Sequence, residues 1–533
     1  RGVYGSNQIT NLAHMRAPYI NQFMIRCFEN GINSKPVTEL EKSDVILIFN
    51  SDLPSEYPVG GNSARKGAIF TGTDLIIANP RKVIFKNESN IDIRLNYSLG
   101  SDGSVANRIS RILIDQGIID VAKAKSAIPN YDEMVQSLVP YTAEATQSST
   151  GLSDEVLTRA AKRFGRTADR FILIGNDIFD TGQGEDVLNA LLNLSILVHH
   201  GAEGSISIFP PREHCNSQGV NDMGCTPDFL PGYRSFNDSD ALSSLTSEWG
   251  IDALKFDNNN PANDLIENCT NGTIKFLHIA GEDPVHSYYK GADIKNALQI
   301  VPFLVVQDVY MTETAQMADI ILPATTFAEK EGSFTNMTRH IQKVTPATLP
   351  QNQSCTDHDI FIKLAEVFGK EFNNSSVSEV QDEISKTVPI YKNKLPGTKS
   401  EQWIPDGFKK NPFFQVTSMH EVAKPKEGFP FQLVSNNHMF HIGSYTHYAK
   451  ALTDIGPDCI AELNPKDAEA LNVIDGDRIV IESTTQKLEV PILISTVTVK
   501  GMVYLPKNWV NVPVNMLRNG EEGPISIKIS KAN

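Results

Sequence analysis

The stretch that decides the fold is residues 315–342, AQMADIILPATTFAEKEGSFTNMTRHIQ. Its short apolar run at 320–322 stops at Pro323, and an apolar run bounded by a breaker predicts a buried strand. A polar, glycine-bearing loop follows, with two glutamates and a lysine at 329–331. Open α/β sheets bind ligands where strands end in such loops, so the stretch indicates a binding site. On physical grounds alone, an ordinary strand-to-loop junction explains it equally well.

Two long motifs carry a resemblance to a known family. The first is LPATTFAEKEGSFTNMTRHIQ at 322–342, and the second is PREHCNSQGVNDMG at 211–224, followed by LPGY at 230–233. Together they resemble the signatures of the molybdopterin oxidoreductases, in the branch of formate dehydrogenase catalytic subunits and the G subunit of NADH-quinone oxidoreductase. The motifs stand in the order found in that family, and the resemblance extends over residues 37–529.

Composition restricts the class of protein. The chain has 533 residues, of which 40% are hydrophobic and 21% charged, as in soluble globular proteins with three or four domains. The formal net charge of -15 argues against a nucleic acid partner, and no apolar run reaches the length of a membrane span. The first residues lack the apolar core of a signal peptide and an initiator methionine, so we expect the natural N-terminus to lie further upstream.

Six cysteines are scattered along the chain, and none forms a CxxC pair. An iron–sulfur cluster of the 4Fe–4S type needs four thiolates that usually lie close together in sequence, so we expect no cluster on this chain. Scattered thiols in a large acidic protein favour a reducing compartment. We therefore expect a cytoplasmic protein, whose association with a membrane complex is made through other subunits.

The chain alternates apolar strands with helical segments. Runs that end in polar residues are predicted as strands at 44–49, 75–77, 171–174, 274–279 and 303–306. This alternation predicts doubly wound, Rossmann-like parallel α/β sheets. Short β runs separated by turns then predict an all-β domain, which the resemblance identifies with the double-psi β-barrel of the family. We expect two α/β domains and a C-terminal β-barrel, bounded as 1–35 with 236–395, 36–235, a linker at 396–424, and 425–533.

The resemblance implies molybdopterin guanine dinucleotide as cofactor, in two copies, with Mo or W as the metal. The pyrophosphate of this cofactor needs backbone N–H groups at glycine-bearing strand-to-helix turns, and the guanine N–H groups suit a carboxylate. Without the family, Asp308 is equally well explained as a helix N-cap. Carried over from the family, the residues that bind one dinucleotide are Gly281, Pro284, Gln307, Asp308, Glu313 and Thr314.

The second dinucleotide belongs to the other α/β domain. Here Asn79 and Arg81 match the Asp-Pro-Arg of the family, but with asparagine in place of the aspartate. An amide offers one neutral acceptor oxygen where a carboxylate offers two charged ones, which weakens guanine recognition. Taken without its context, His441 is a plain surface histidine. The other cofactor-binding positions that the resemblance implies are Ser51, Asp52, Gly100, Asp102, Gly175, Asn216, Gln218, Asp222, Glu329, Asn336, His441, Gly443, Ser444 and Asn515.

Arg212 is the catalytic candidate. The resemblance implies that it lies beside the metal and holds the carboxylate of formate, a task that suits a bidentate guanidinium. The alternative is a surface arginine in a salt bridge. Next to it, Glu213 replaces a glycine of the family and puts a negative charge near the proposed formate site. We therefore expect Glu213 to weaken substrate binding.

The metal-ligand loop of the family has no counterpart in this sequence. Formate dehydrogenases carry the ligand, Cys or selenocysteine, in a Cys-His step before a glycine-rich loop. Here Cys27 precedes Phe28, and residues 28–35 lead almost directly into 36–38. A buried cysteine usually acts as a small hydrophobe, so no metal ligand is assigned. Either the chain binds no metal through a thiolate, or the given sequence omits the segment that carries the ligand. We expect the N-terminal iron–sulfur domain of the family to be missing as well.

Two functions are consistent with these residues. The first is a molybdopterin-dependent subunit of formate dehydrogenase type, which interconverts formate and CO₂ and passes two electrons to an iron–sulfur partner subunit. The alternative is a non-catalytic scaffold within an electron-transfer complex, like the G subunit of NADH-quinone oxidoreductase. Arg212 and the retained pterin positions favour the first, and Glu213 and the missing ligand loop favour the second.

Overall fold

The structure, a computed structural model, describes every residue except 29–34, 86–90, 252–263, 371–375, 395–408, 411, 421, 423, 442, 457, 519–522 and 533. The side chains of residues 23, 27 and 444 also lie outside the described part. The chain divides into two compact units. Unit 1 consists of Arg1–Pro18 and Arg212–Pro405, and unit 2 of Tyr19–Pro211 and Asp406–Asn533.

The two units begin and end at other residues than the predicted domains. Helix α2 (Tyr19–Cys27) packs against α10 (Gly184–Gly201) of unit 2, whereas the predicted boundary after residue 35 groups it with residues 236–395. Of the predicted linker at 396–424, residues 396–408 lie outside the described residues. Further along, Gln415 and Asn193 exchange two hydrogen bonds of 3.0 and 2.7 Å within unit 2. Domains with the predicted boundaries stay a prediction.

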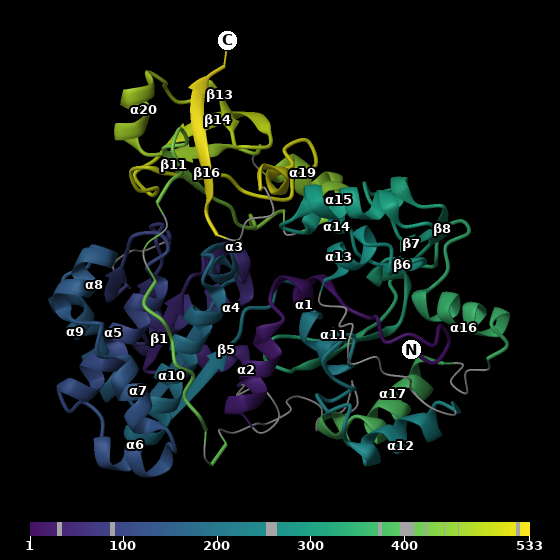
Figure 1. Cartoon of the computed structure of the whole chain (residues 1–533), viewed down its shortest axis with the longest axis horizontal. Coiled ribbons are helices and arrows are strands. Elements are labelled where there is room, and N and C mark those ends of the chain that lie inside the picture. The colour runs from purple at the N-terminus through teal and green to yellow at the C-terminus, as the bar shows by residue number, and fades with distance from the viewer. Residues whose placement is uncertain are drawn as a thin grey trace. The chain divides into compact units, whose positions relative to one another are not determined.

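Unit 2 contains a parallel sheet with the strand order β3-β2-β1-β4-β5. Figure 1 labels two of these strands, β1 and β5. Every residue of β1 is buried, as expected for a central strand that is covered on both faces. The register pairs the last residue of β1 with the last residues of β2 and β4, so three strand ends meet at one edge. The strands are β1 (Val45–Phe49), β2 (Asp74–Ala78), β3 (Ile93–Leu95), β4 (Asp169–Ile174) and β5 (Ser205–Phe209).

Helices flank this sheet, and their sequences explain where they begin and end. Helix α9 (Asp154–Arg166) starts at the N-cap Ser153, with acids in its first turn and arginines in its last, which suits the helix dipole. Helix α10 is apolar on nearly all sides and is buried along most of its length. The other helices of this part are α3 (Leu53–Glu56), α4 (Pro58–Lys66), α5 (Asp102–Asp115), α6 (Val121–Ala127), α7 (Tyr131–Ser137) and α8 (Ala143–Thr150).

The C-terminal part of unit 2 is a closed barrel with the strand order β11-β15-β12-β14-β13-β16. Its core includes Leu463, Ile481 and Val503, which are fully buried. Closure removes the unpaired strand edges that an open sheet exposes. The elements are β11 (Phe431–Val434), α18 (Ser444–His447), α19 (Lys450–Ile455), β12 (Ala461–Leu463), α20 (Pro465–Leu471), β13 (Arg478–Glu482), β14 (Lys487–Ile494), β15 (Met502–Tyr504) and β16 (Ile525–Lys531).

Unit 1 contains a smaller parallel sheet in the order β6-β7-β8 and an antiparallel hairpin of β9 and β10. Helix α15 packs on this sheet through Ile294 and Leu298, which meet Leu304 and Val306 of β7 in one apolar cluster. The strands are β6 (Leu277–Ala280), β7 (Leu304–Asp308), β8 (Ile320–Pro323), β9 (Gly332–Thr335) and β10 (Ile341–Val344). The helices are α1 (Leu12–Arg16), α11 (Ser217–Asp222), α12 (Ser239–Glu248), α13 (Leu265–Thr270), α14 (Pro284–Ser287), α15 (Gly291–Ile300), α16 (Asp357–Val367) and α17 (Val377–Thr387).

The stretch at 315–342 forms β8 and the hairpin, but the prediction that β8 is buried is wrong. Ile320 is 44% exposed and Ile321 is 37% exposed. Among the described residues β8 pairs with β7 alone, so it is an edge strand, and its side chains are covered on fewer sides. An apolar run in the sequence does not reveal which strand lies at the edge of a sheet.

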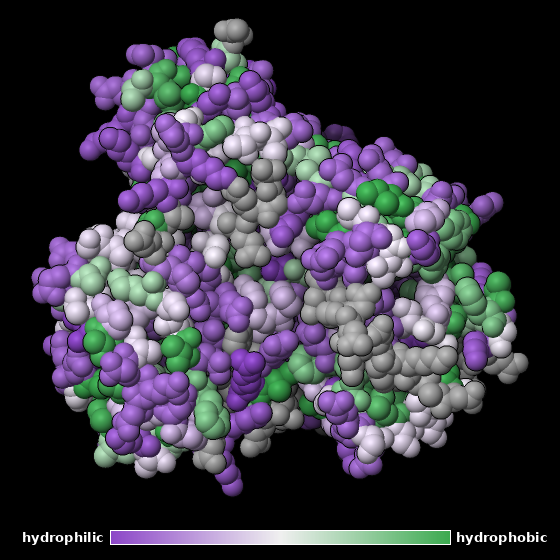
Figure 2. Space-filling view, viewed as in Figure 1, coloured by the Kyte–Doolittle hydropathy of each residue, from purple (hydrophilic) through white to green (hydrophobic). Residues whose placement is uncertain are grey.

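The predicted fold class is confirmed, with parallel α/β sheets in both units and a closed barrel near the C-terminus. Figure 2 shows hydrophilic side chains over most of the visible face, in keeping with a chain in which 21% of the residues are charged. Of the helices that the structure describes, none combines the length and the apolar character needed to cross a bilayer.

Candidate functional site

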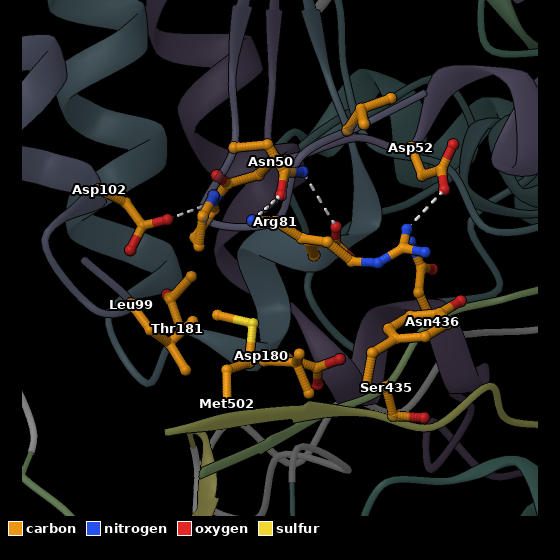
Figure 3. A pocket seen from close by; sticks show the side chains of 16 residues that line it. Asn50, Asp52, Arg81, Leu99, Asp102, Asp180, Thr181, Ser435, Asn436 and Met502 are labelled. Carbon is orange, nitrogen blue, oxygen red and sulfur yellow. Dashed lines mark hydrogen bonds and ion pairs between the residues drawn. The ribbon is translucent and has the colours of Figure 1, made fainter. Parts of the chain in front are cut away.

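A pocket that opens to solvent lies in unit 2 at the carboxyl ends of the parallel strands (Figure 3). The strand ends meet here because β1, β2 and β4 run in the same direction and in register. The polar residues that line the pocket are Asn50 and Asp52 after β1, Asn79 and Arg81 after β2, Asp102 at the start of α5, Asp177, Asp180 and Thr181 after β4, and Ser435, Asn436 and Tyr504 from the barrel part.

Arg81 is held by carboxylates on two sides of this pocket. Its guanidinium lies 3.0 Å from Asp52 and forms a bidentate pair with Glu462 of β12, with Nη2 at 2.8 and 2.9 Å from the two carboxylate oxygens. The guanidinium also stacks over the ring of Tyr504, with its carbon 4.1 Å from the ring centroid. The charge of Arg81 is therefore neutralised within unit 2, and its geometry is fixed by three neighbours.

Asn79 makes one local bond and one bond across the pocket. Its side-chain oxygen accepts from the backbone N–H of Arg81 at 2.9 Å, which closes a turn after β2. Its amide nitrogen donates to Asp177 at 3.3 Å. Burial raises the pKa of the Asp177 carboxyl well above its usual value, and the nearby Glu56 and Asp180 raise it further.

Glu56 joins three segments around the pocket by hydrogen bonds. Its carboxylate accepts from the backbone N–H of Asp52 and of Asn176, both at 3.0 Å, and from the side-chain amide of Asn436 at 2.6 Å. Burial raises the pKa of Glu56 to about 7, and the charge of Asp52 adds to the shift, while the three donors oppose it. Glu56 is thus a carboxyl group with a raised pKa that is hydrogen-bonded to two residues of the pocket lining, Asp52 and Asn436.

Asp102 belongs to a second buried network at the first turn of α5. Its carboxylate accepts from Asn50 Nδ2 at 2.8 Å and from the hydroxyl of Tyr97 at 3.0 Å, and Tyr97 also contacts the Asn50 side chain. Asn50 has a positive φ of 51°, a conformation that asparagine adopts more readily than most residues. Sequence reasoning missed Asn50, Tyr97, Glu56 and Asp177, although Asn50 and Asp177 stand directly after apolar strands and could have been singled out for that reason.

The other predicted residues of unit 2 do not all line the pocket. Gly175 is required where β4 ends, because an added Cβ would lie 2.1 Å from the carbonyl oxygen of Asn50. Gly100 has a positive φ of 82° directly before α5. His441 stacks on Trp509 at 4.4 Å between ring centroids and is buried, so it is not a surface histidine. The pocket lining does not include His441, Gly443 or Asn515, and the Ser444 side chain lies outside the described residues.

Arg212 lies in unit 1 in a buried chain of polar contacts. Its Nε donates to Gln218 Oε1 at 2.9 Å, and Gln218 in turn donates to Asp222 at 2.7 Å and to the Tyr233 hydroxyl at 2.9 Å. Gln218 and Asp222 are four residues apart on α11, so they face the same side of that helix. Tyr391 donates to the second oxygen of Asp222 at 2.9 Å. Arg212 is therefore an oriented, buried side chain, which excludes the surface alternative.

Glu213 has a partner that the sequence did not indicate. Arg16 at the end of α1 lies 3.1 Å from the Glu213 carboxylate, and both side chains are largely buried. The charge of Glu213 is thus compensated within unit 1, and the expectation that it weakens anion binding loses much of its physical basis. Asn216 accepts from the backbone N–H of Thr335 at 2.9 Å, which joins α11 to β9.

Glu329 and Asn336 hold the backbone in the described structure. Glu329 forms a capping box with Thr326, in which each side chain accepts a hydrogen bond from the backbone N–H of the other residue. Asn336 accepts from the N–H groups of Thr338 and His340 at 2.9 and 3.0 Å, within the hairpin of β9 and β10. Both positions were predicted to bind cofactor, and both carry a clear local structural role.

The strand ends of unit 1 form a second polar group. Gly281 has a positive φ of 66°, with open space where a Cβ would lie, and its N–H donates to the carbonyl of Gln307 at 2.8 Å. Asp308 accepts from the N–H of Val309 at 2.6 Å, which is a turn contact rather than a helix N-cap. Thr314 donates its hydroxyl to Asp283 at 2.6 Å, which joins the turn before Pro284 to the loop after β7.

Two further predicted residues of this group face other partners. The side chain of Gln307 donates to Asp357 at 2.7 Å, and Glu313 lies 3.9 Å from Lys295, a long and partly exposed pair. Burial raises the pKa of Glu282 to about 8, with a further contribution from Glu213. Among the described residues, no group of three or more His, Cys, Asp or Glu side chains has the geometry of a metal site.

Comparison with known proteins identifies the family. The Molybdopterin oxidoreductase family matches residues 4–367, and the Molydopterin dinucleotide binding domain matches residues 431–530. This chain belongs to the molybdopterin oxidoreductase family. The resemblance of the two long motifs is thereby confirmed, and the second match supports a molybdopterin cofactor.

Relatives within the molybdopterin oxidoreductases include formate dehydrogenases. The chain is 28% identical to the F420-dependent formate dehydrogenase subunit alpha of Methanocaldococcus jannaschii, over 96% of this chain and 79% of that protein. It is 24% identical to formate dehydrogenase H of Escherichia coli (strain K12), over 96% and 74%. It also shares its fold with the acetylene hydratase from Pelobacter acetylenicus, with a TM-score of 0.76 at 16% identity, over 100% of this chain and 83% of that one.

The residues of the unit 2 pocket fit part of a pterin dinucleotide. Ser435 lines the pocket, and its buried hydroxyl has no hydrogen-bond partner among the described residues, so a ligand is one way to satisfy it. The hydroxyl of Ser51 is likewise buried and without a partner in the described part of the chain, but Ser51 does not line the pocket. Carboxylates and amide oxygens that accept hydrogen bonds suit the N–H edge of a guanine. The close packing at Gly175 keeps the loops after β1 and β4 together at this edge.

Proposed function

We propose that this chain is the cofactor-binding catalytic subunit of a formate dehydrogenase-type oxidoreductase. The reaction is the oxidation of formate to CO₂, with release of one proton and two electrons, or the reverse. The electrons pass to a partner subunit that carries iron–sulfur clusters, in a cytoplasmic complex. The observation that carries the proposal is the buried Arg212, whose guanidinium is held by Gln218 and, through it, by Asp222.

The role of Arg212 is to bind and orient the carboxylate of formate. A guanidinium presents a planar fork of donors that matches both oxygens of a carboxylate. The hydrogen bond from Nε to Gln218 restricts rotation of that fork, and the bonds from Gln218 to Asp222 and Tyr233 restrict Gln218. Because Arg212 is only 6% exposed, its bonds to an anion form in a site that contains little water, where they are strong.

The cofactor is proposed to be molybdopterin guanine dinucleotide in two copies, with Mo or W. When bound, it supplies the two-electron redox chemistry. Gly281, Asp308 and Thr314 in unit 1 and the strand-end residues of the unit 2 pocket are the proposed dinucleotide positions. In unit 1, the open space at Gly281 allows close approach of a phosphate to the backbone.

A second candidate function is the non-catalytic scaffold. It is favoured by one observation in the sequence, since Cys27 is followed by Phe28 rather than His and no glycine-rich ligand loop comes after it. Residues 29–34 and the Cys27 side chain lie outside the described part of the structure. In that case the pterin sites are vestigial, and Arg212 serves only to hold the buried polar chain of unit 1.

The decisive experiment uses the protein isolated from its native host together with its partner subunits. Mo and W are measured by elemental analysis, pterin by the fluorescence of its acid-released form, and activity by formate-dependent reduction of a viologen dye. We expect metal, pterin and activity. Arg212→Lys should lower kcat/KM for formate on the order of tenfold to a hundredfold at unchanged pterin content, since one charge-assisted bond is lost.

A matched control is Arg234→Lys in the same unit. Arg234 donates to the backbone carbonyls of Pro231 and Thr387, so its replacement perturbs folding contacts without touching the proposed formate site. Pterin and metal without formate activity in the wild-type complex would favour the scaffold. Equal losses in the two variants would remove the special role of Arg212.

A further inference from the structure

We propose that Asp177 takes over the guanine-recognising role that position 79 has lost in this chain. The inference rests on the proposed function, because it concerns the second dinucleotide site. Asn79 directly follows β2 and begins the turn there, and Asp177 lies in the short 3₁₀ helix Asn176–Asp180 after β4. The two side chains meet in the same pocket, where Asn79 Nδ2 donates to Asp177 Oδ2 at 3.3 Å. A carboxylate is therefore present beside position 79, although it comes from a different strand.

Guanine recognition asks for a specific acceptor. The base presents two parallel donors, N1–H and N2–H, and an ionised carboxylate offers two parallel acceptor oxygens at matching positions. The amide of Asn79 offers a single oxygen, and that oxygen already accepts from the backbone N–H of Arg81 at 2.9 Å. The remaining lone pair of this oxygen can accept one further bond, so Asn79 alone does not match both parallel donors of the base.

The other acids of the pocket are already engaged. Asp52 pairs with Arg81 at 3.0 Å, and Asp180 pairs with Arg518 at 2.9 Å. Asp102 accepts from Asn50 and Tyr97 through Oδ1 and is completely buried, so its Oδ2, which has no hydrogen-bond partner among the described residues, is not accessible to a base. Each of these carboxylates loses a strong contact if it turns towards a ligand.

Asp177 differs from its neighbours in this respect. Within the described residues it accepts one hydrogen bond, the 3.3 Å contact from Asn79, and forms no ion pair. It lines the pocket and is partly accessible. Burial and the nearby charges of Glu56 and Asp180 raise the pKa of Asp177. The ionised form is therefore unfavourable unless hydrogen-bond donors stabilise it. A donor-rich base edge supplies what Asp177 lacks.

The test compares GMP with IMP as probes of the base edge. IMP has the N1–H but lacks the N2 amino group, and the contribution of the phosphate is the same for both. Binding is measured by equilibrium dialysis on the full chain with Asp308→Ala, so that the unit 1 site does not contribute. We expect GMP to bind on the order of tenfold more tightly than IMP, as one charge-assisted hydrogen bond predicts.

Asp177→Asn should bring the GMP/IMP ratio close to one. The double variant Asp177→Asn with Asn79→Asp should restore the preference for GMP, because it returns a carboxylate to position 79. Asp132→Asn is the control, since it removes one negative charge from an exposed position beside Lys125, away from the pocket lining, and should leave the ratio unchanged. A merely structural role of Asp177 predicts weaker binding of both nucleotides at an unchanged ratio, and that result would overturn the proposal.

The proposed function is tested separately by pterin and metal in the native complex. A wild-type chain that binds GMP and IMP equally would refute the role of Asp177, whatever the pterin content. A native complex without pterin would refute the proposed function, while the GMP/IMP ratio would still report on Asp177.

Discussion

Glu56→Gln should change how the stability of unit 2 depends on pH. Burial raises the pKa of Glu56 to about 7, from 4.5 in an unfolded chain. Between these values the folded state keeps a proton that the unfolded state has lost, so stability falls as pH rises through this window and levels off above it. Each pKa unit corresponds to about 1.4 kcal/mol, so Glu56 removes about 2–3 kcal/mol of stability between pH 5 and pH 8.

Glutamine removes this ionisation while it keeps most of the contacts. Its amide oxygen can still accept from the N–H of Asp52 or Asn176, as the Glu56 carboxylate does at 3.0 Å. The variant should therefore be less stable than the wild type near pH 5, because it lacks one hydrogen bond. Towards pH 8 this difference in the free energy of unfolding should shift steadily in favour of the variant, since only the wild type is destabilised by ionisation. The neighbouring Asp177 also has a raised pKa, and because Glu56 adds to that shift, the variant should lose part of the pH dependence of Asp177 as well, in the same direction.

The assay is the free energy of opening of unit 2, measured by hydrogen exchange in peptides that cover β1 and β4 from pH 5 to pH 8. Asp132→Asn is the control, because Asp132 lies exposed beside Lys125 and surface pairs contribute little to stability. If the wild type and Glu56→Gln differ by the same free energy at every pH, Glu56 ionises at its ordinary pKa and the reasoning from burial is refuted.

Three further predictions concern the candidate sites. Asp308→Ala should remove ~1–3 kcal/mol of guanine affinity and Asn79→Ala clearly less, measured as guanine nucleotide released per chain on denaturation; equal losses would contradict the asymmetry. Gln218→Leu should raise the KM for formate more than it lowers kcat, because it frees the orientation of Arg212, and an unchanged KM would speak against that role. Arg81→Met should lower the melting temperature of unit 2, at a cost of roughly 2–4 kcal/mol, since two carboxylates lose their cation; an unchanged melting curve would contradict this.

Much of the fold could be predicted because its signals are local. The apolar run at 44–49 became β1 (Val45–Phe49), and the run at 171–174 lies within β4 (Asp169–Ile174). The exposure of β8 could not be predicted in this way, because burial of an edge strand depends on partners elsewhere in the chain. Domain boundaries also depend on contacts that are distant in sequence, since α2 packs on α10, more than 150 residues away along the chain.

The candidate site was predictable where one strand end carries its own polar residue. The resemblance to the family placed Asp52, Asn79 and Asp102 among the cofactor-binding positions, and all three line the pocket. The contact between Asn79 and Asp177 was not, because the two residues are 98 positions apart and meet only when β2 and β4 lie on either side of β1. The ion pair between Glu213 and Arg16 could not be predicted for the same reason, because the two residues are far apart in the sequence.

The loss of an aspartate at position 79 is therefore a weaker argument against a second guanine site than the sequence suggests. In a parallel sheet the loops after neighbouring strands open on one edge, so a functional group can come from any of several strand ends. Here the acids after β1 and β4 and at the start of α5 surround Asn79, and all but Asp177 are engaged by cations or by Asn50 and Tyr97. A half-buried carboxylate that lies close to other acids and is bound by a single amide gains most from new hydrogen-bond donors. Position 79 then sets the turn, and Asp177 sets the preference for the base.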